Sequence, residues 1–72
     1  MPEVPRNVRQ TEASRAFIRA GGIRRKSKGG HLIIKMPNGH IVSLPNGVIK
    51  IGLLQAEVRK SGLTMDDFVN LL

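Results

Sequence analysis

The stretch HLIIKMPNGHIVSL, from His31 to Leu44, decides the fold because it predicts two strands joined by a tight turn. His31–Met36 and His40–Leu44 are short apolar runs typical of β-strands. Pro37-Asn38-Gly39 lies between them, and Asn-Gly between two apolar runs is a strong hairpin signal. We therefore expect an antiparallel β-hairpin in the middle of the chain.

A second hairpin is predicted just before the first. Ile23–Lys26 can form a short strand, and the SKGG segment at residues 27–30 can turn the chain because glycine readily takes a positive φ angle. Together the three segments predict a three-stranded antiparallel sheet.

Helical patterns lie on both sides of these strands. From Asn7 to Ala20, apolar residues recur at i, i+3, i+4 and i+7 spacing, and Gly21-Gly22 supplies a stop signal. Lys50–Ser61 repeats this periodicity and is followed by Gly62, a typical residue after a helix end. Two helices are therefore expected, one before and one after the sheet.

A last helix is predicted at the C-terminal end. Thr64 is suited to cap it, Asp67 matches the partner position of a capping box, and Leu63 can pack against Phe68. The order α-β-β-β-α-α predicts an α+β fold, a two-layer sandwich with helices on one face of a three-stranded antiparallel sheet. We expect residues 1–72 to form a single domain, with residues 1–7 as a flexible N-terminal extension.

The strands carry apolar residues on both faces, which leaves open the face that meets the helices. With Asn38-Gly39 at the tip, Pro37 would lie opposite His40. That pairing divides the apolar strand residues into one set with Leu32, Ile34, Met36 and Ile41 and another with Ile33, Val42 and Leu44. An apolar outer face would suit a protein partner or a second copy of the chain.

Positive charge is concentrated in the first half of the chain. The formal net charge is +7, from 12 Lys or Arg against 5 Asp or Glu. Residues 1–35 contain nine of the cations and two of the carboxylates, whereas residues 36–72 contain three of each. A localised basic patch is the electrostatic footprint of a protein that docks on nucleic acid, although a charged surface can also serve solubility alone.

The composition argues against several other classes of protein. There is no cysteine, and two histidines with five carboxylates make a poor set of metal ligands, so no cofactor is expected. No apolar run is long enough to cross a membrane, and the N-terminus does not resemble a targeting peptide. We expect a cytoplasmic protein without a membrane partner.

His31 is the residue best placed for chemistry. A neutral imidazole beside bound RNA can take a proton from a 2′-hydroxyl, whose oxygen then attacks the adjacent phosphorus. Neighbouring Lys and Arg side chains would hold the phosphates and the charge that develops there. Such a site would cleave RNA and not DNA, because deoxyribose lacks the nucleophile. Spacing alone, however, favours an ordinary histidine beside a turn.

His40 is expected to be an ordinary residue at the start of a strand. Six residues of strand would separate it from His31, or about 20 Å at ~3.3 Å per residue, so one phosphate could not contact both. A second acid or base would have to be a lysine, a water molecule or a residue of a second subunit.

Several motifs occur in the order found in one known family. They are a helix ending in glycine, a basic strand leading to the glycine-small-histidine turn Gly29-Gly30-His31, a strand ending in PNG, the strand IVSLP, and the C-terminal RKSGLTMDDFVNLL. From about Phe17 to Leu72 the chain thereby resembles the HicA-type (YcfA-like) mRNA interferase toxins. These small proteins have a double-stranded-RNA-binding-domain-like fold and carry their catalytic histidine in that turn, which implies a catalytic role for His31.

The resemblance also implies an activity and partners. The chain would be an RNA endonuclease toxin of a type II toxin–antitoxin system that cleaves mRNA without the ribosome. The free protein would be a monomer or weak homodimer, and a HicB-type antitoxin would inhibit it.

Leu32 departs from the family, which often has a polar residue or histidine after the catalytic histidine. The segment NGVIKIG is also shorter and less basic than its family counterpart. The expected RNA-binding residues are Arg24, Arg25, Lys26, Lys28, Gly29, Gly30 and Lys35.

Two other functions stay open from the sequence. One is a non-catalytic RNA-binding module of the same fold, in which His31 contacts a 2′-hydroxyl or phosphate. The other is a DNA-binding or protein-interaction module that uses the basic half only for docking. The chain has no Trp or Tyr for stacking on bases, so we expect weak sequence preference for any RNA.

Overall fold

The computed structural model describes residues 6–72, with the backbone alone for residues 27 and 28. The elements in chain order are α1 (Gln10–Arg19), β1 (Ile23–Lys28), β2 (His31–Lys35), β3 (Ile41–Leu44), α2 (Ile51–Lys60) and α3 (Met65–Leu71). The strands form one antiparallel sheet in the order β1-β2-β3. The predicted α+β fold and its element order are confirmed.

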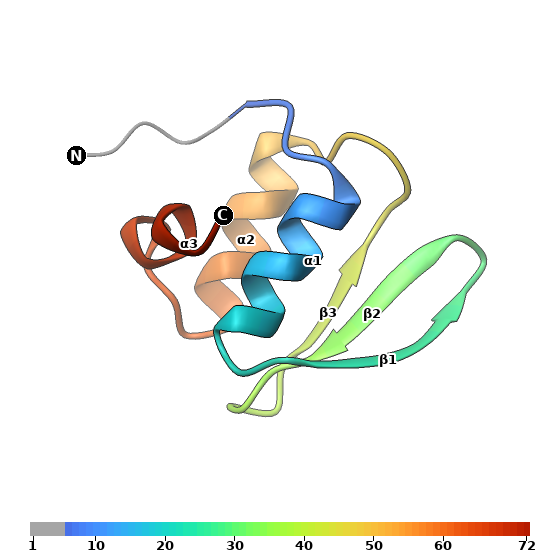
Figure 1. The fold of residues 1–72 in the computed structure, drawn as a ribbon, viewed down its shortest axis with the longest axis horizontal. Coiled ribbons are helices and arrows are strands. Elements are labelled where there is room, and N and C mark those ends of the chain that lie inside the picture. The colour runs from blue at the N-terminus through green and yellow to red at the C-terminus, as the bar shows by residue number, and fades with distance from the viewer. Residues whose placement is uncertain (1–5) are drawn as a thin grey trace.

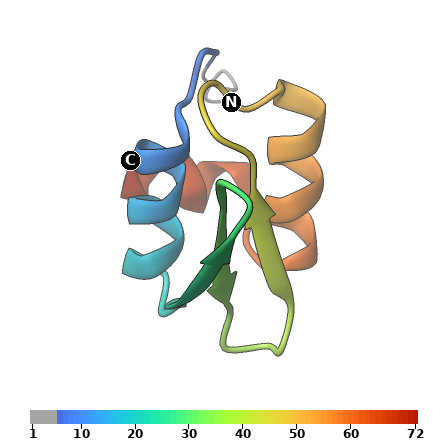
Figure 2. The same ribbon diagram turned by 90° about the vertical axis from the view of Figure 1, so that its right-hand side faces the viewer.

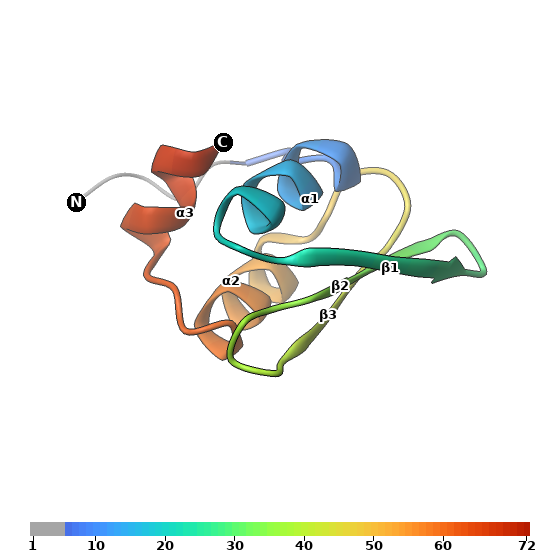
Figure 3. The same ribbon diagram turned by 60° about the horizontal axis from the view of Figure 1, so that its bottom comes forward.

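The helices form a second layer on one face of the sheet. Helix α1 contacts β2 and β3 on this face, and α3 packs against both α1 and α2 (Figure 1). Helices α1 and α2 stand apart on opposite sides of the molecule in Figure 2. The β1–β2 hairpin reaches past the N-terminal end of α1 (Figure 3). In the described part of the chain no helix covers the opposite face of the sheet, which we call the open face.

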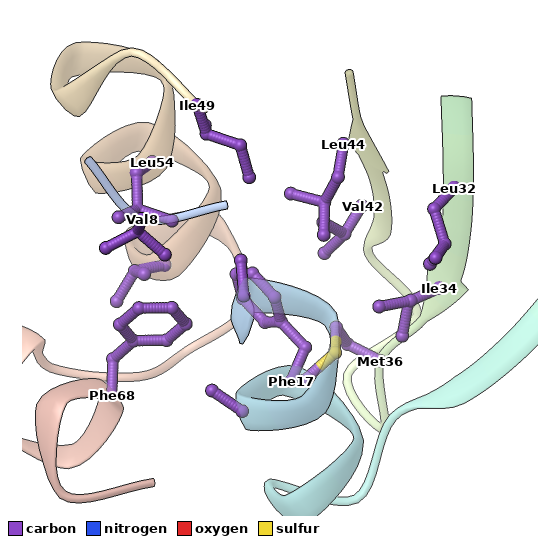
Figure 4. Packing of buried hydrophobic residues seen from close by; sticks show 13 residues of the cluster. Val8, Phe17, Leu32, Ile34, Met36, Val42, Leu44, Ile49, Leu54 and Phe68 are labelled. Carbon is purple, nitrogen blue, oxygen red and sulfur yellow. The ribbon is translucent and has the colours of Figure 1, made fainter. Parts of the chain in front are cut away.

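The core lies between the two layers. Phe17 of α1 is fully buried at its centre, and its ring centroid lies 5.1 Å from that of Phe68 of α3 (Figure 4). Burying an apolar side chain of this size contributes about 1.5–3 kcal/mol, so these contacts dominate the stability of so small a domain. The sheet side of the core consists of Leu32, Ile34, Met36, Val42 and Leu44.

The turn between β2 and β3 contains three residues, so the predicted pairing is wrong by one residue. The amide of Met36 donates to the carbonyl oxygen of His40 at 2.9 Å, which places Met36 opposite His40. Pro37 cannot take this position because it has no N–H to donate. Gly39 closes the turn with a φ of +90°, and its amide donates to the Met36 oxygen at 2.9 Å.

This shift of one residue decides which side chains meet the helices. Directly paired residues share a face, and Ile34 pairs with Val42 while Lys35 pairs with Ile41. Val42 is fully buried, whereas Ile41 is 49% exposed on the open face. The predicted sets are therefore wrong: they placed Ile41 on the face of Leu32, and Val42 and Leu44 on the other face.

Several element ends differ from the prediction. Helix α1 begins at Gln10 rather than Asn7, because Arg9 is extended and forms an isolated antiparallel bridge with Val48. Strand β1 continues to Lys28, so the turn after it is shorter than SKGG. The C-terminal ends of α1 and β2, the start of β3 and both ends of α2 each lie one residue inside the predicted ranges. Residues 1–5 of the extension expected over 1–7 lie outside the described residues.

The start of α3 agrees with the prediction. The hydroxyl of Thr64 accepts a hydrogen bond from the Asp67 amide at 3.1 Å, and the Asp67 carboxylate accepts one from the Thr64 amide at 3.3 Å. Gly62 has a φ of +78° after the end of α2. Leu63 packs against the core that contains Phe68.

Within residues 6–72 no helix combines the length and hydropathy needed to cross a lipid bilayer.

Candidate nucleic-acid interface

His31 is the first residue of β2 and lies on the open face of the sheet. Along β2 the buried residues Leu32 and Ile34 alternate with more accessible residues at positions 31, 33 and 35. His31 is exposed and shares the open face with Ile33 and Lys35. An incoming ligand can therefore reach its imidazole without displacing a helix.

The turn before His31 consists of two glycines. Gly29 and Gly30 have φ angles of +59° and +81°, the pair of positive values that a two-residue type I′ hairpin turn requires. A Cβ added to either glycine would meet no other described atom within 4 Å. The turn is therefore open to solvent, and a phosphate can approach its backbone closely.

A β-bulge in β1 precedes this turn. Arg25 pairs with Ile33 and Lys28 pairs with His31, so three steps along β1 match two steps along β2. The extra residue lets the two glycines close the hairpin directly between Lys28 and His31. Bulges increase the local twist and change where neighbouring side chains point, and they are common beside functional sites.

Two of the predicted cationic residues lie on the open face with His31. Arg25 is exposed and pairs with Ile33, which is the next residue after His31 on the same face of β2. Lys35 is exposed and pairs with Ile23 on one side and Ile41 on the other. Among the side chains that the structure describes, the open face thus combines one imidazole with two cations, an arrangement suited to a phosphate backbone.

The other predicted cations are placed differently. Arg24 pairs with Ile34 and so belongs to the face toward the helices, although it is exposed because β1 is an edge strand. Lys26 is exposed and lies within the bulged segment. The side chain of Lys28 lies outside the described atoms, and its backbone pairs with that of His31.

The open face also carries apolar side chains, as expected from the strands. Ile23 is 66% exposed and Ile41 is 49% exposed, and both flank Lys35. Ile33 is partly buried between Arg25 and Ser43. Its apolar residues match neither predicted set, because Val42 and Leu44 face the core and Ile41 lies on the open face.

Gln10 contacts the turn and was not identified from the sequence. Its side-chain nitrogen donates to the carbonyl oxygens of Gly30 and Leu44, each at 2.9 Å. Its own amide donates to the carbonyl oxygen of Gly47 at 2.9 Å. The two side-chain contacts span 20 and 34 residues, so no local pattern could have indicated them.

His40 lies in a different part of the molecule. Its Nε2 atom is 2.9 Å from Oε2 of Glu57, and the two side chains are only 23% and 11% exposed. In the observed register Met36 lies opposite His40. Met36 is five residues from His31 along the strand, which corresponds to about 17 Å at ~3.3 Å per residue. The predicted distance of about 20 Å was too long, but His40 still cannot reach a phosphate held at His31.

The remaining titratable residues do not form a second centre. No three His, Asp or Glu side chains come together within residues 6–72. The described carboxylates all belong to the helices: Glu12 to α1, Glu57 to α2, and Asp66 and Asp67 to α3. The chemistry of the open face therefore depends on His31 and its cations.

The sequence matches no protein-family model and no curated protein sequence. The resemblance to HicA-type toxins accordingly stays a prediction based on the motifs.

Proposed function

We propose that this protein is an RNA endonuclease of the HicA type in which His31 is the general base. The observation that carries the proposal is the exposed position of His31 on the open face, beside the Gly29-Gly30 turn and on the same face as Arg25 and Lys35. This arrangement supplies a proton acceptor and two phosphate-binding cations on one accessible surface.

In the proposed reaction His31 takes the proton of an RNA 2′-hydroxyl. The 2′-oxygen forms a bond to the adjacent phosphorus, and the bond from phosphorus to the 5′-oxygen of the next nucleotide breaks. The leaving oxygen takes a proton from a lysine or a water molecule, which yields a 2′,3′-cyclic phosphate and a 5′-hydroxyl end. General acid–base help of this kind contributes roughly 10²–10⁴-fold to the rate.

Arg25 and Lys35 would hold the RNA during this reaction. Cations that contact phosphates fix the register of the strand and carry no sequence information. A cation close to the reacting phosphate would also stabilise the negative charge that develops in the transition state. The enzyme is therefore expected to select RNA over DNA strongly and one RNA sequence over another weakly.

A non-catalytic RNA-binding module is the second candidate function. It is favoured because no second histidine or carboxyl group accompanies His31 on the open face among the described residues, since His40 contacts Glu57 and the carboxylates lie on helices. In that case His31 would only contact a phosphate or 2′-hydroxyl. Binding would then stay strong while the RNA stays intact.

We further propose that a HicB-type antitoxin inhibits the protein in the cytoplasm by covering the open face. The exposed Ile23 and Ile41 beside Lys35 give this face both apolar and cationic contacts. An inhibitor that buried this surface would block access to His31. A complex in which the antitoxin contacts the helices alone would contradict this binding mode.

The function can be tested with a single-stranded RNA and the DNA of the same sequence, incubated with the purified chain in EDTA. The variants are His31→Ala and, as a matched control on the open face, Ser43→Ala. Cleavage of RNA alone with cyclic phosphate ends, lost in His31→Ala and kept in Ser43→Ala, would support the nuclease.

Two other outcomes identify other functions. Salt-sensitive binding of intact RNA by both variants would indicate the RNA-binding module. Equal binding of DNA and RNA without cleavage would reject both RNA functions.

A further inference from the structure

The Gly29-Gly30 turn that carries His31 has little support of its own. Glycine has more backbone freedom than any other residue, and two in succession form the whole turn. A Cβ added to either glycine would meet no described atom within 4 Å other than its chain neighbours, so the side of the turn that a side chain would occupy is open. The hairpin also reaches past the N-terminal end of α1 (Figure 3). A catalytic histidine at this place needs another source of order.

Gln10 supplies a connection from the turn to the rest of the fold. Its side-chain nitrogen has two hydrogens, and both are used, one for the oxygen of Gly30 and one for that of Leu44. The carbonyl of Gly30 belongs to the peptide group that leads into His31. Gln10 therefore joins the start of α1, the end of β3 and the peptide before His31.

The backbone of Gln10 is itself held in place. Its amide donates to the oxygen of Gly47, and the preceding residue Arg9 pairs with Val48. The side chain thus extends from an anchored helix start toward an otherwise unsupported turn. Carbonyl oxygens accept hydrogen bonds and do not donate them, so this position requires a side chain that donates.

We infer that Gln10 is a positioning residue for His31: it orders the peptide before His31 and thereby holds the imidazole where it can meet a 2′-hydroxyl. This inference rests on the proposed function. General-base catalysis depends steeply on the placement of the base. Binding of the phosphate backbone depends on Arg25 and Lys35, which Gln10 does not contact. The loss of Gln10 should therefore lower kcat and leave KM largely unchanged.

Two substitutions remove the connection in different ways. Gln10→Ala removes the donor, and Gln10→Glu keeps the shape but sets carboxylate oxygens against two carbonyl oxygens. Gln55→Glu is the matched control, because it makes the same change of charge on α2, at the other glutamine of the chain. The amide spectrum and circular dichroism of each variant verify that it is folded.

The experiment combines RNA cleavage kinetics with ¹⁵N relaxation of the backbone. For both Gln10 variants we expect kcat to fall about tenfold, KM to stay within about twofold, and the heteronuclear NOE to fall at Gly29, Gly30 and His31 only. Gln55→Glu should match the wild type in kcat and in these NOE values.

Other results would overturn the inference. Wild-type kcat in folded Gln10 variants would reject the positioning role and leave the nuclease intact. A rise in KM without a fall in kcat, or a loss of order throughout the sheet, would mean that Gln10 is merely structural. If the wild-type chain does not cleave RNA at all, the proposed function fails and the positioning role fails with it.

Discussion

Replacing Gly22 with alanine is expected to destabilise the fold strongly, because of close contacts rather than backbone angle. Gly21 has a φ of +103° after α1, whereas Gly22 has no left-handed φ. A Cβ at Gly22 would lie 2.6 Å from Cγ2 of Ile34 and 2.8 Å from Sδ of Met36. It would also lie 2.8 Å from the backbone oxygen of Phe17.

The size of the effect follows from these distances. Nonbonded carbon atoms normally sit about 3.5–4.0 Å apart, so the side chain of Ile34 would have to move by roughly 1 Å. The Phe17 oxygen cannot move away freely, because it accepts hydrogen bonds from the amides of Gly22 at 3.0 Å and Ala20 at 3.2 Å. Overpacking of a core costs about 1–3 kcal/mol, and we expect about 3 kcal/mol here. This corresponds to a fall in Tm of roughly 12–24 °C.

The assay is urea and thermal unfolding followed by far-ultraviolet circular dichroism, since the chain has no Trp or Tyr for fluorescence. Gly52→Ala is the control. Gly52 lies in the first turn of α2, and an added Cβ meets no described atom within 4 Å, so this change should add about 0.5–1 kcal/mol of stability. A Gly22→Ala variant within about 0.5 kcal/mol of the wild type would refute the reasoning.

Three further predictions test the register, the contact between His40 and Glu57, and the open face. Val42→Thr should lower the free energy of unfolding by about 1–3 kcal/mol, because it buries a hydroxyl. Ile41→Thr, at an exposed position, should change this free energy by less than about 0.5 kcal/mol. Urea unfolding measures both variants. In the same assay His40→Ala should cost about 1–3 kcal/mol, because it leaves the largely buried carboxylate of Glu57 without its partner. Arg25→Gln should reduce the slope of log affinity for RNA against log salt by about 0.7, as measured by fluorescence anisotropy of labelled RNA.

Each of these three predictions has an outcome that contradicts it. Equal losses in Val42→Thr and Ile41→Thr would mean that the register is not the one described. Wild-type stability in His40→Ala would mean that the contact between His40 and Glu57 contributes nothing to folding. Arg15→Gln, at an exposed cation on α1, is the control for RNA binding. An equal reduction of the salt slope in Arg15→Gln would mean that Arg25 acts only through the net charge.

The β2–β3 turn shows how far sequence patterns carry the fold. The PNG signal correctly predicted a hairpin at residues 37–39, but the pairing derived from Asn-Gly alone was wrong by one residue. The signal that decides the register is Pro37, which lacks the N–H that its predicted place opposite His40 requires. Met36 supplies that donor instead, at 2.9 Å from the His40 oxygen.

The candidate site was found in part. The accessible His31, the glycine turn and the basic strand before it followed from local composition. Gln10 and the contact between His40 and Glu57 did not, because they join segments that are 20, 34 and 17 residues apart. Arg24 and Arg25 are neighbours, so any strand places them on opposite faces, and only the strand pairing decides that Arg25 is the one on the open face.

By itself the sequence determined the order of helices and strands, because the signals for it act within a few residues. Turn glycines, apolar periodicity and the Thr64 capping box each operate locally. Only the tertiary structure decided which face of the sheet is open, because both faces carry isoleucines and the two sets differ by one residue of register. The hydrogen bonds of the hairpin and the packing of the strands on Phe17 select one set for the core. That choice leaves His31 on the accessible face.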